Sequence, residues 1–163
     1  MEKKETIIRF HWGREAVSIS IGGTILSAAL LMTILNDGAP PRFLKYTLAL
    51  LLAAPIISGL FIAPLYIAVN DDKVLIRKPL ASVEIPVRDI VSVQKIHFNE
   101  IRDAIRTFGS GGLFGFVGYF KNNGFGRFLM YATETKNLVL IRTDRKSYIV
   151  SCRNPEAIVS KLQ

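Results

Sequence analysis

The feature that most constrains this fold is a pair of long N-terminal segments without ionisable side chains. Ala16 to Leu35 is a run of 20 residues, and Thr47 to Val69 is a run of 23, without Asp, Glu, Lys, Arg or His. As a helix rising about 1.5 Å per residue, the first run extends about 30 Å, the hydrocarbon thickness of a bilayer. A chain of 163 residues has too little other protein to bury two such helices. We therefore expect both segments to span a membrane.

The connector between the two runs indicates a helical hairpin. Residues 36–45 contain an Asn-Asp-Gly sequence and a Pro-Pro pair, which favour a short connection between antiparallel helices. Pro55 and Pro64 interrupt the second run, but prolines are tolerated within membrane helices. The first run is longer than the apolar part of a signal peptide, and no small-x-small cleavage site follows it.

Basic residues near the ends of the two segments predict their orientation. Four Lys or Arg precede Ala16, two lie in the connector, and four lie between Asn70 and Asp89. By the positive-inside rule, both termini face the cytoplasm and the protein lies in the cytoplasmic (inner) membrane. The single Cys152 is consistent with a reducing compartment. We expect a cytoplasmic N-terminal segment at 1–15, a transmembrane hairpin at 16–69 and a cytoplasmic domain at 70–163.

The predicted cytoplasmic domain is basic. From Asn70 to Gln163 there are 15 Lys or Arg against 9 Asp or Glu, giving a net charge of +6 out of +8 for the chain. A basic domain held next to an anionic leaflet gains about 1 kcal/mol for each Lys or Arg near the surface. We therefore expect membrane lipids as its counter-charge, and we do not expect nucleic acid.

Short β-branched runs separated by turn residues predict a mainly-β domain after the second span. Strands are expected at 65–69, 74–78, 83–85, 90–97, 128–133, 137–142 and 147–152. The first strand, starting near residue 65, follows the span without a linker, which keeps the domain close to the membrane. Asn154 and Pro155 are suitable residues for a helix start, and an apolar stripe then predicts a C-terminal helix covering the open end of the barrel.

Seven short strands followed by one helix is the pleckstrin-homology (PH) arrangement, and several stretches make the resemblance more specific. They are 106–115 with Gly118, 131–133, 137–143 and 154–157. With these stretches the chain resembles the membrane-anchored bacterial PH-like domain family. The resemblance implies a bacterial protein with a two-helix transmembrane hairpin, followed by a mainly-β PH-like barrel of about seven strands capped by a C-terminal α-helix. It brings no catalytic residues.

The remaining motifs do not indicate an enzyme. The glycine-rich run 109–115 lacks the Lys-Ser or Lys-Thr pair of a nucleotide P-loop, and glycines inside β structure commonly permit close backbone approach. His11 and His97 are isolated, and with one cysteine they give no metal-ligand spacing. No nucleophile-and-base set is recognisable. We expect neither catalysis nor a cofactor.

Basic and apolar residues of the domain supply the candidate binding surface. The candidates for contact with anionic lipid or a partner are Arg102, Arg106, Lys121 and Arg127. The candidate apolar loop consists of Leu113, Phe114, Phe116 and Phe120, which either dips into the headgroup region or fills a core or subunit interface. Residues 98–108 predict either a short helix or a strand bent by the glycines that follow.

Small residues recur four apart in both apolar segments. The candidates for close helix packing are Gly22, Gly23, Ser27, Ser58 and Gly59. Such pairs let helix backbones approach closely, and we favour packing within the hairpin over packing between molecules.

Two hypotheses for function follow. The first is a membrane-tethered PH-like binding or scaffolding protein that contacts anionic lipid headgroups or partner proteins at the cytoplasmic membrane face. The second is an accessory subunit of a membrane complex or transporter that assembles through its helices. No charge lies inside either span, so an ion path through this chain alone is not expected. A homo-oligomer formed through exposed strand edges is compatible with both.

Overall fold

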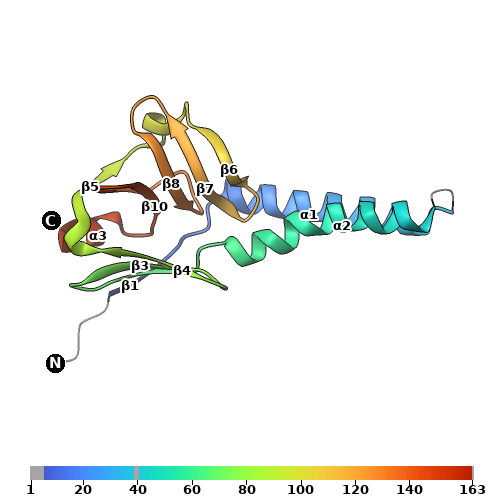
Figure 1. Ribbon diagram of the computed structural model, residues 1–163, viewed down its shortest axis with the longest axis horizontal. Helices are drawn as coiled ribbons and strands as arrows, with labels where there is room; N and C mark the ends of the chain where they lie inside the picture. The colour runs from blue at the N-terminus through green and yellow to red at the C-terminus, as the bar shows by residue number, and fades with distance from the viewer. Residues whose placement is uncertain (1–5, 39–40, 163) are drawn as a thin grey trace.

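Two long helices extend from one end of a β-sheet domain in the computed structural model, which describes residues 6–38 and 41–162 (Figure 1). Residues 1–5 of the expected N-terminal segment, Ala39 and Pro40 of the connector, and Gln163 lie outside the described residues. Helix α1 (Arg14–Asn36) and helix α2 (Arg42–Ile62) pack side by side. Both are long and apolar enough to cross a membrane, and only 6% of the most apolar window of each is buried. That exposure is unlike a helix in the core of a soluble protein.

Helix α2 ends seven residues before the end of the predicted span. It includes Pro55 and stops at Ile62, with Pro64 in the short segment that follows. The last apolar residues of the run instead form strand β2 (Tyr66–Val69), where they pair with neighbouring strands. An apolar composition alone does not distinguish the end of a spanning helix from a buried strand.

The first sheet contains a strand, β1, that its sequence pattern does not predict. Its order is β1 (Thr6–Arg9), β2, β3 (Lys73–Arg77) and β4 (Ser82–Pro86), with all neighbours antiparallel. Strand β1 pairs with β2 in the register Ile8 opposite Ile67. The chain therefore forms one strand of the domain, leaves through both helices, and returns to the adjacent strand.

The second sheet has six strands in the order β5-β9-β10-β8-β7-β6. The strands are β5 (Ile90–Ile96), β6 (Ile105–Gly112), β7 (Gly115–Asn122), β8 (Gly126–Ala132), β9 (Leu138–Thr143) and β10 (Ser147–Ser151). Neighbours are antiparallel except β8 and β10, which are parallel. The predicted fold class is confirmed: two apolar helices, a mainly-β PH-like domain and a C-terminal helix. Two corrections apply, because the described strands number ten rather than about seven and the sheets do not close into a barrel.

Both faces of the six-stranded sheet are buried at its central strands. One face packs toward the four-stranded sheet through residues such as Val139 and Ile141, and the opposite face buries residues such as Leu138 and Leu140. These four consecutive residues of β9 are fully buried, which explains why the alternation of apolar and polar residues in this strand is imperfect.

The C-terminal helix α3 (Pro155–Leu162) packs into the core between the sheets, at the end of the domain away from α1 and α2 (Figure 1). Its Ile158 is fully buried. Lys161 Nζ donates hydrogen bonds to the Val69 carbonyl (2.8 Å) and to Thr6 Oγ1 (3.1 Å). Helix α3 thereby joins β1 and β2 to the rest of the domain.

The segment predicted as a short helix or a bent strand contains elements of both kinds. A 3-10 helix, η2 (Phe98–Ile101), precedes β6, and the register of β6 shifts between Arg106 and Phe108. The His97 amide donates to Glu100 Oε1 (2.7 Å), so this histidine begins the 3-10 helix. A second 3-10 helix, η1 (Val87–Asp89), connects the two sheets.

Candidate functional site at the helix–domain junction

The tip of the β6–β7 hairpin lies against the two long helices. The Phe114 amide donates a 2.8 Å hydrogen bond to Ser20 Oγ of α1, and that hydroxyl donates in turn to the Ala16 carbonyl (2.6 Å). Ser20 is 7% exposed. A backbone amide removed from water is costly without a partner, so this hydrogen bond favours one position of the hairpin tip.

Two of the predicted small residues make room for that tip. A Cβ atom on Gly23 of α1 would lie 3.3 Å from Leu113 Cδ1, and a Cβ atom on Gly59 of α2 would overlap the ring of Phe114. By contrast, a Cβ atom on Gly22 would have nothing within 4 Å. Gly23 and Gly59 therefore allow a β-hairpin, rather than the partner helix, to approach closely.

The other two predicted packing residues have different surroundings. Ser27 lines a small apolar crevice between α1 and α2, so it lies on the side of α1 that faces the partner helix. Ser58 lies on the groove beside β6, and its hydroxyl donates to the Pro55 carbonyl (3.1 Å).

The start of α1 is bound to the segment after β8. The Gly13 amide donates to the Thr133 carbonyl (2.9 Å), and Thr133 Oγ1 donates to the His11 carbonyl (2.7 Å). Thr135 Oγ1 donates to Glu15 Oε2 (3.0 Å). Together with the hairpin tip and the direct connection from α2 to β2, these bonds hold the helices to the domain at three places.

The glycine-rich motif permits the close pairing of β6 and β7. Gly109 and Gly118 are paired across the two strands, with φ of 111° and 136°. A Cβ atom on either would clash with the backbone of the opposite strand. These glycines are needed for strand geometry.

A groove lies beside the hairpin tip, between α2 and β6. It is partly open, has a volume of about 560 Å³ and has mostly apolar walls, including Ile19, Ile62 and Phe108. Among the described residues that line it, Arg106 is the one with a charge.

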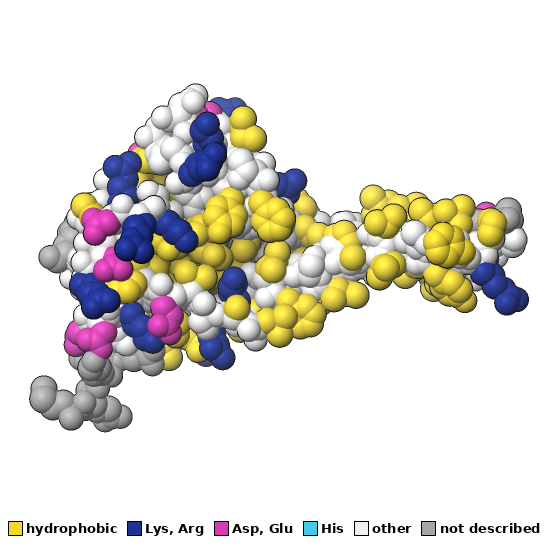
Figure 2. Space-filling model, in the orientation of Figure 1, with side chains coloured by type: hydrophobic (Ala, Val, Ile, Leu, Met, Phe, Trp, Pro, Cys, Tyr) yellow, Lys and Arg dark blue, Asp and Glu magenta, His cyan; other side chains and the backbone are white. Residues whose placement is uncertain are grey.

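Large apolar side chains are exposed on the part of the domain that adjoins the helices. Phe108 of β6 is 75% exposed and pairs with Tyr119 of β7, which is 50% exposed. Leu80, also 75% exposed, lies in the β3–β4 turn. Figure 2 shows apolar side chains continuing from the helices onto the domain, with Lys and Arg around them. On the visible face of the domain, Asp and Glu lie mainly away from the helices.

The four predicted basic residues do not form one cluster. Arg106 lies in the groove, whereas Lys121 and Arg127 pair with each other near the β7–β8 turn, at the end of β7 away from the helices. Arg102 is exposed after η2. Lys78 was not among the predicted basic residues; it lies two residues before Leu80, and its Nζ is 5.4 Å from the centre of the Tyr131 ring. The sequence signal that could have identified it is a lysine two residues before a leucine, in a turn between two predicted strands.

Two of the four residues of the predicted apolar loop, Phe116 and Phe120, belong to the core of the domain or pack against it. Phe120 is 6% exposed and stacks on Phe128 in the core, with ring centres 5.9 Å apart. Phe116 packs partly buried against the same core. Leu113 and Phe114 are the residues that reach the helices.

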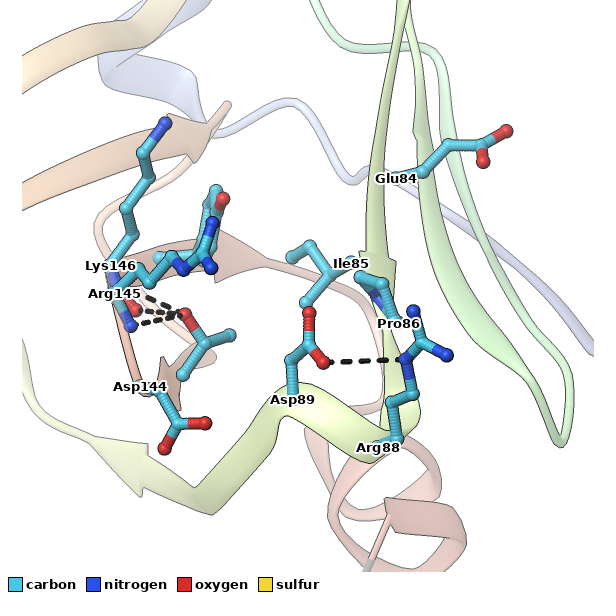
Figure 3. A pocket seen from close by; sticks show the side chains of 10 residues that line it. Glu84, Ile85, Pro86, Arg88, Asp89, Asp144, Arg145 and Lys146 are labelled. Carbon is cyan, nitrogen blue, oxygen red and sulfur yellow. Dashed lines mark hydrogen bonds and ion pairs between the residues drawn. The ribbon is translucent and has the colours of Figure 1, made fainter.

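A second, polar recess lies at the far end of the domain, between β4, η1 and the β9–β10 turn (Figure 3). Its three basic residues, Arg88, Arg145 and Lys146, are matched by three acidic ones, Glu84, Asp89 and Asp144. Arg88 Nε lies 3.5 Å from Asp89 Oδ1, and Figure 3 shows Glu84 pointing away from the other charged groups. A balanced set of charges attracts an anion less strongly than an unopposed cation.

The described residues contain no recognisable nucleophile or metal centre. Burial raises the pKa of the Cys152 thiol to about 12, so almost no thiolate is present at neutral pH. No group of three His, Cys, Asp or Glu side chains within 6–38 and 41–162 is arranged to hold a metal ion.

The fold and the junction together define a small β-sheet binding domain carried on an apolar helical hairpin. The family model described as "Bacterial PH domain" matches residues 65–163, more than half of the chain. The protein therefore belongs to the bacterial PH domain family, whose members have a general binding or scaffolding role. No curated protein matches the chain significantly. Strand β1 and both long helices lie outside the matched residues.

Proposed function

We propose that this protein is a membrane-anchored binding module of the bacterial inner membrane. The helical hairpin spans the bilayer with both termini in the cytoplasm, and the PH-like domain binds anionic lipid headgroups at the cytoplasmic face. It performs no catalytic step. The observation that carries this proposal is the hydrogen bond from the Phe114 amide to Ser20, which fixes the domain to the hairpin.

The position of Ser20 indicates how deep the hairpin tip lies. Ser20 follows the start of the apolar run at Ala16 by four residues, or about 6 Å along a helix. With that run in the bilayer, Phe114 lies at the inner edge of the hydrocarbon. Non-helical backbone is tolerated at this depth only where its polar groups have partners, and Ser20 supplies one for Phe114.

The β3–β4 turn brings a second set of residues to the same surface. The Leu65 amide, just after α2, donates to the Arg77 carbonyl (2.8 Å), so the turn that follows Arg77 lies near the helices. The turn presents the exposed Leu80 two residues after Lys78. An apolar residue beside a basic one favours insertion among anionic headgroups.

The test uses the full chain, because β1 belongs to the sheet and an isolated domain would lack it. Hydrogen exchange is measured in nanodiscs of phosphatidylcholine alone and of phosphatidylcholine with phosphatidylglycerol. We expect the backbone amides of Lys78, Leu80 and Ala81 to exchange more slowly with phosphatidylglycerol present, and salt to reduce the difference. The double variant Arg77→Gln, Lys78→Gln removes the difference, whereas the matched variant Arg88→Gln, Arg145→Gln in the far recess keeps it.

Equal exchange of the Lys78, Leu80 and Ala81 amides in the two bilayers contradicts the lipid-binding proposal. The exposed outer faces of α1 and α2 also fit the second hypothesis, an accessory subunit that assembles through its helices. A stoichiometric partner in a gentle-detergent pull-down from native membranes would favour that hypothesis.

A further inference from the structure

We infer that the groove between α2 and β6 holds one anionic glycerophospholipid, with its phosphate on Arg106 and an acyl chain along α2. This inference rests on the proposed insertion of the helical hairpin into a membrane. It goes further by assigning a single site to a single lipid molecule, in addition to general contact with headgroups.

The helix side of the groove is one face of α2. Pro55, Ser58, Gly59 and Ile62 line it, at the spacing of residues that share a helix face. Ser58 is small and exposed, which leaves room beside it, whereas the ring of Phe114 covers Gly59. The groove is partly open, and its volume of about 560 Å³ is comparable with ordinary ligand sites, which span about 300–1,000 Å³.

The domain side of the groove supplies a cation. Within the described part of the chain, Arg106 forms no ion pair, and no acidic residue lines the groove. A Cβ atom on Gly111 would lie 3.0 Å from Arg106 Nη1. Gly111 thus leaves room for the guanidinium group to lie over the strand.

The two hydroxyl groups of the groove are already used as donors. Ser58 Oγ donates to the Pro55 carbonyl, and Ser110 Oγ donates to the Leu113 carbonyl. Arg106 is therefore the side chain that can donate to an added anion. A guanidinium group matches a phosphate because it can form two parallel hydrogen bonds to it.

The order of apolar and charged groups along the groove favours a lipid. Pro55 lies within the apolar run of α2, deeper than the start of β2, whereas Arg106 belongs to the domain. The apolar walls are thus at acyl-chain depth and the cation is nearer the headgroups. A lipid molecule has the same order of groups, from acyl chain to phosphate. The surrounding bilayer already contains such molecules.

Native mass spectrometry of the full chain released from nanodiscs containing equal amounts of phosphatidylglycerol and phosphatidylcholine tests the inference. We expect one retained phosphatidylglycerol on the natural protein. Arg106→Gln reduces the lipid-bound fraction about tenfold, the loss expected for a charged hydrogen-bonding partner. Arg145→Gln is the matched control, because Arg145 lines the far polar recess and not the groove, and it retains the lipid.

A second variant keeps the test decisive if Arg106→Gln does not fold. Ser58→Phe fills the groove from an exposed position on α2 and should also release the lipid. Three results overturn the inference: no retained lipid on the natural protein, equal retention of the two lipids, or undiminished retention in the variants. The proposed function is tested by a different experiment. Equal exchange of the Lys78, Leu80 and Ala81 amides in both bilayers contradicts the proposed function, whatever lipid retention is measured for the natural protein and Arg106→Gln.

Discussion

The amide of Phe114 and the hydroxyl of Ser20 are 94 residues apart in the sequence and 2.8 Å apart in the structure. Through this contact the β6–β7 hairpin joins the domain to α1. Replacing Ser20 with Ala leaves the Phe114 amide without that partner, which should lower the free energy of unfolding by about 1–3 kcal/mol. Chemical denaturation of the detergent-solubilised full chain measures the change. Ser18→Ala, at an exposed position on the same helix, should be nearly neutral.

Adding one methyl group to Gly59 should destabilise the protein. A Cβ atom there overlaps the ring of Phe114, and such overpacking costs about 1–3 kcal/mol. Gly22→Ala is the matched control, because its Cβ has open space and alanine favours a helix by up to about 1 kcal/mol. Equal melting temperatures for Gly59→Ala and Gly22→Ala would show that the hairpin tip does not lie against α2.

Strand β1 should contribute to the stability of the domain even though it precedes both helices. Ile8 is 8% exposed and belongs to the core, whereas its neighbour Ile7 is 59% exposed. Ile8→Ala should lower the free energy of unfolding by about 2–5 kcal/mol, and Ile7→Ala should change it little. Similar effects of the two substitutions would mean that β1 is not part of the folded sheet.

Stability should fall in alkaline solution through Tyr131. Burial raises the pKa of its phenol from 10.0 to about 12, so the folded protein holds this proton more tightly than the unfolded chain. The contribution of the protonated Tyr131 to the free energy of unfolding is intact below pH 10, and it is lost as the pH rises from about 10 to 12. Thermal unfolding across this window should show a declining midpoint, with a shallower decline for Tyr131→Phe.

Much of this fold was predictable because its signals are local. The two apolar helices, the strands from β2 to β5 and from β8 to β10, and the C-terminal helix follow from composition and periodicity. Strand β1 has only four residues, and its partner β2 lies beyond both helices. Strands β6 and β7 contain many glycines and give no clear alternation. Their pairing depends on backbone contacts that the sequence pattern does not report.

The candidate site was predictable only in part, for a related reason. Gly23 and Gly59 were selected as small residues four apart from another small residue, and Arg106 was selected as a basic residue of the domain. The partner of both glycines is a β-hairpin tip far along the chain, so the helix–helix interpretation did not identify it. Lys121 shares a strand with the tip but lies at its other end, and only the strand register determines that distance.

The depth of Leu80 tests most directly whether the domain is held against the membrane. A fluorophore on Leu80→Cys is compared with one on Asp144→Cys, a residue of the far recess, in nanodiscs containing brominated phospholipids. The buried Cys152, with its thiol pKa raised to about 12, stays unlabelled at neutral pH. The account predicts strong quenching at position 80 and little at position 144. Equal quenching at both positions, or none at position 80, would contradict it.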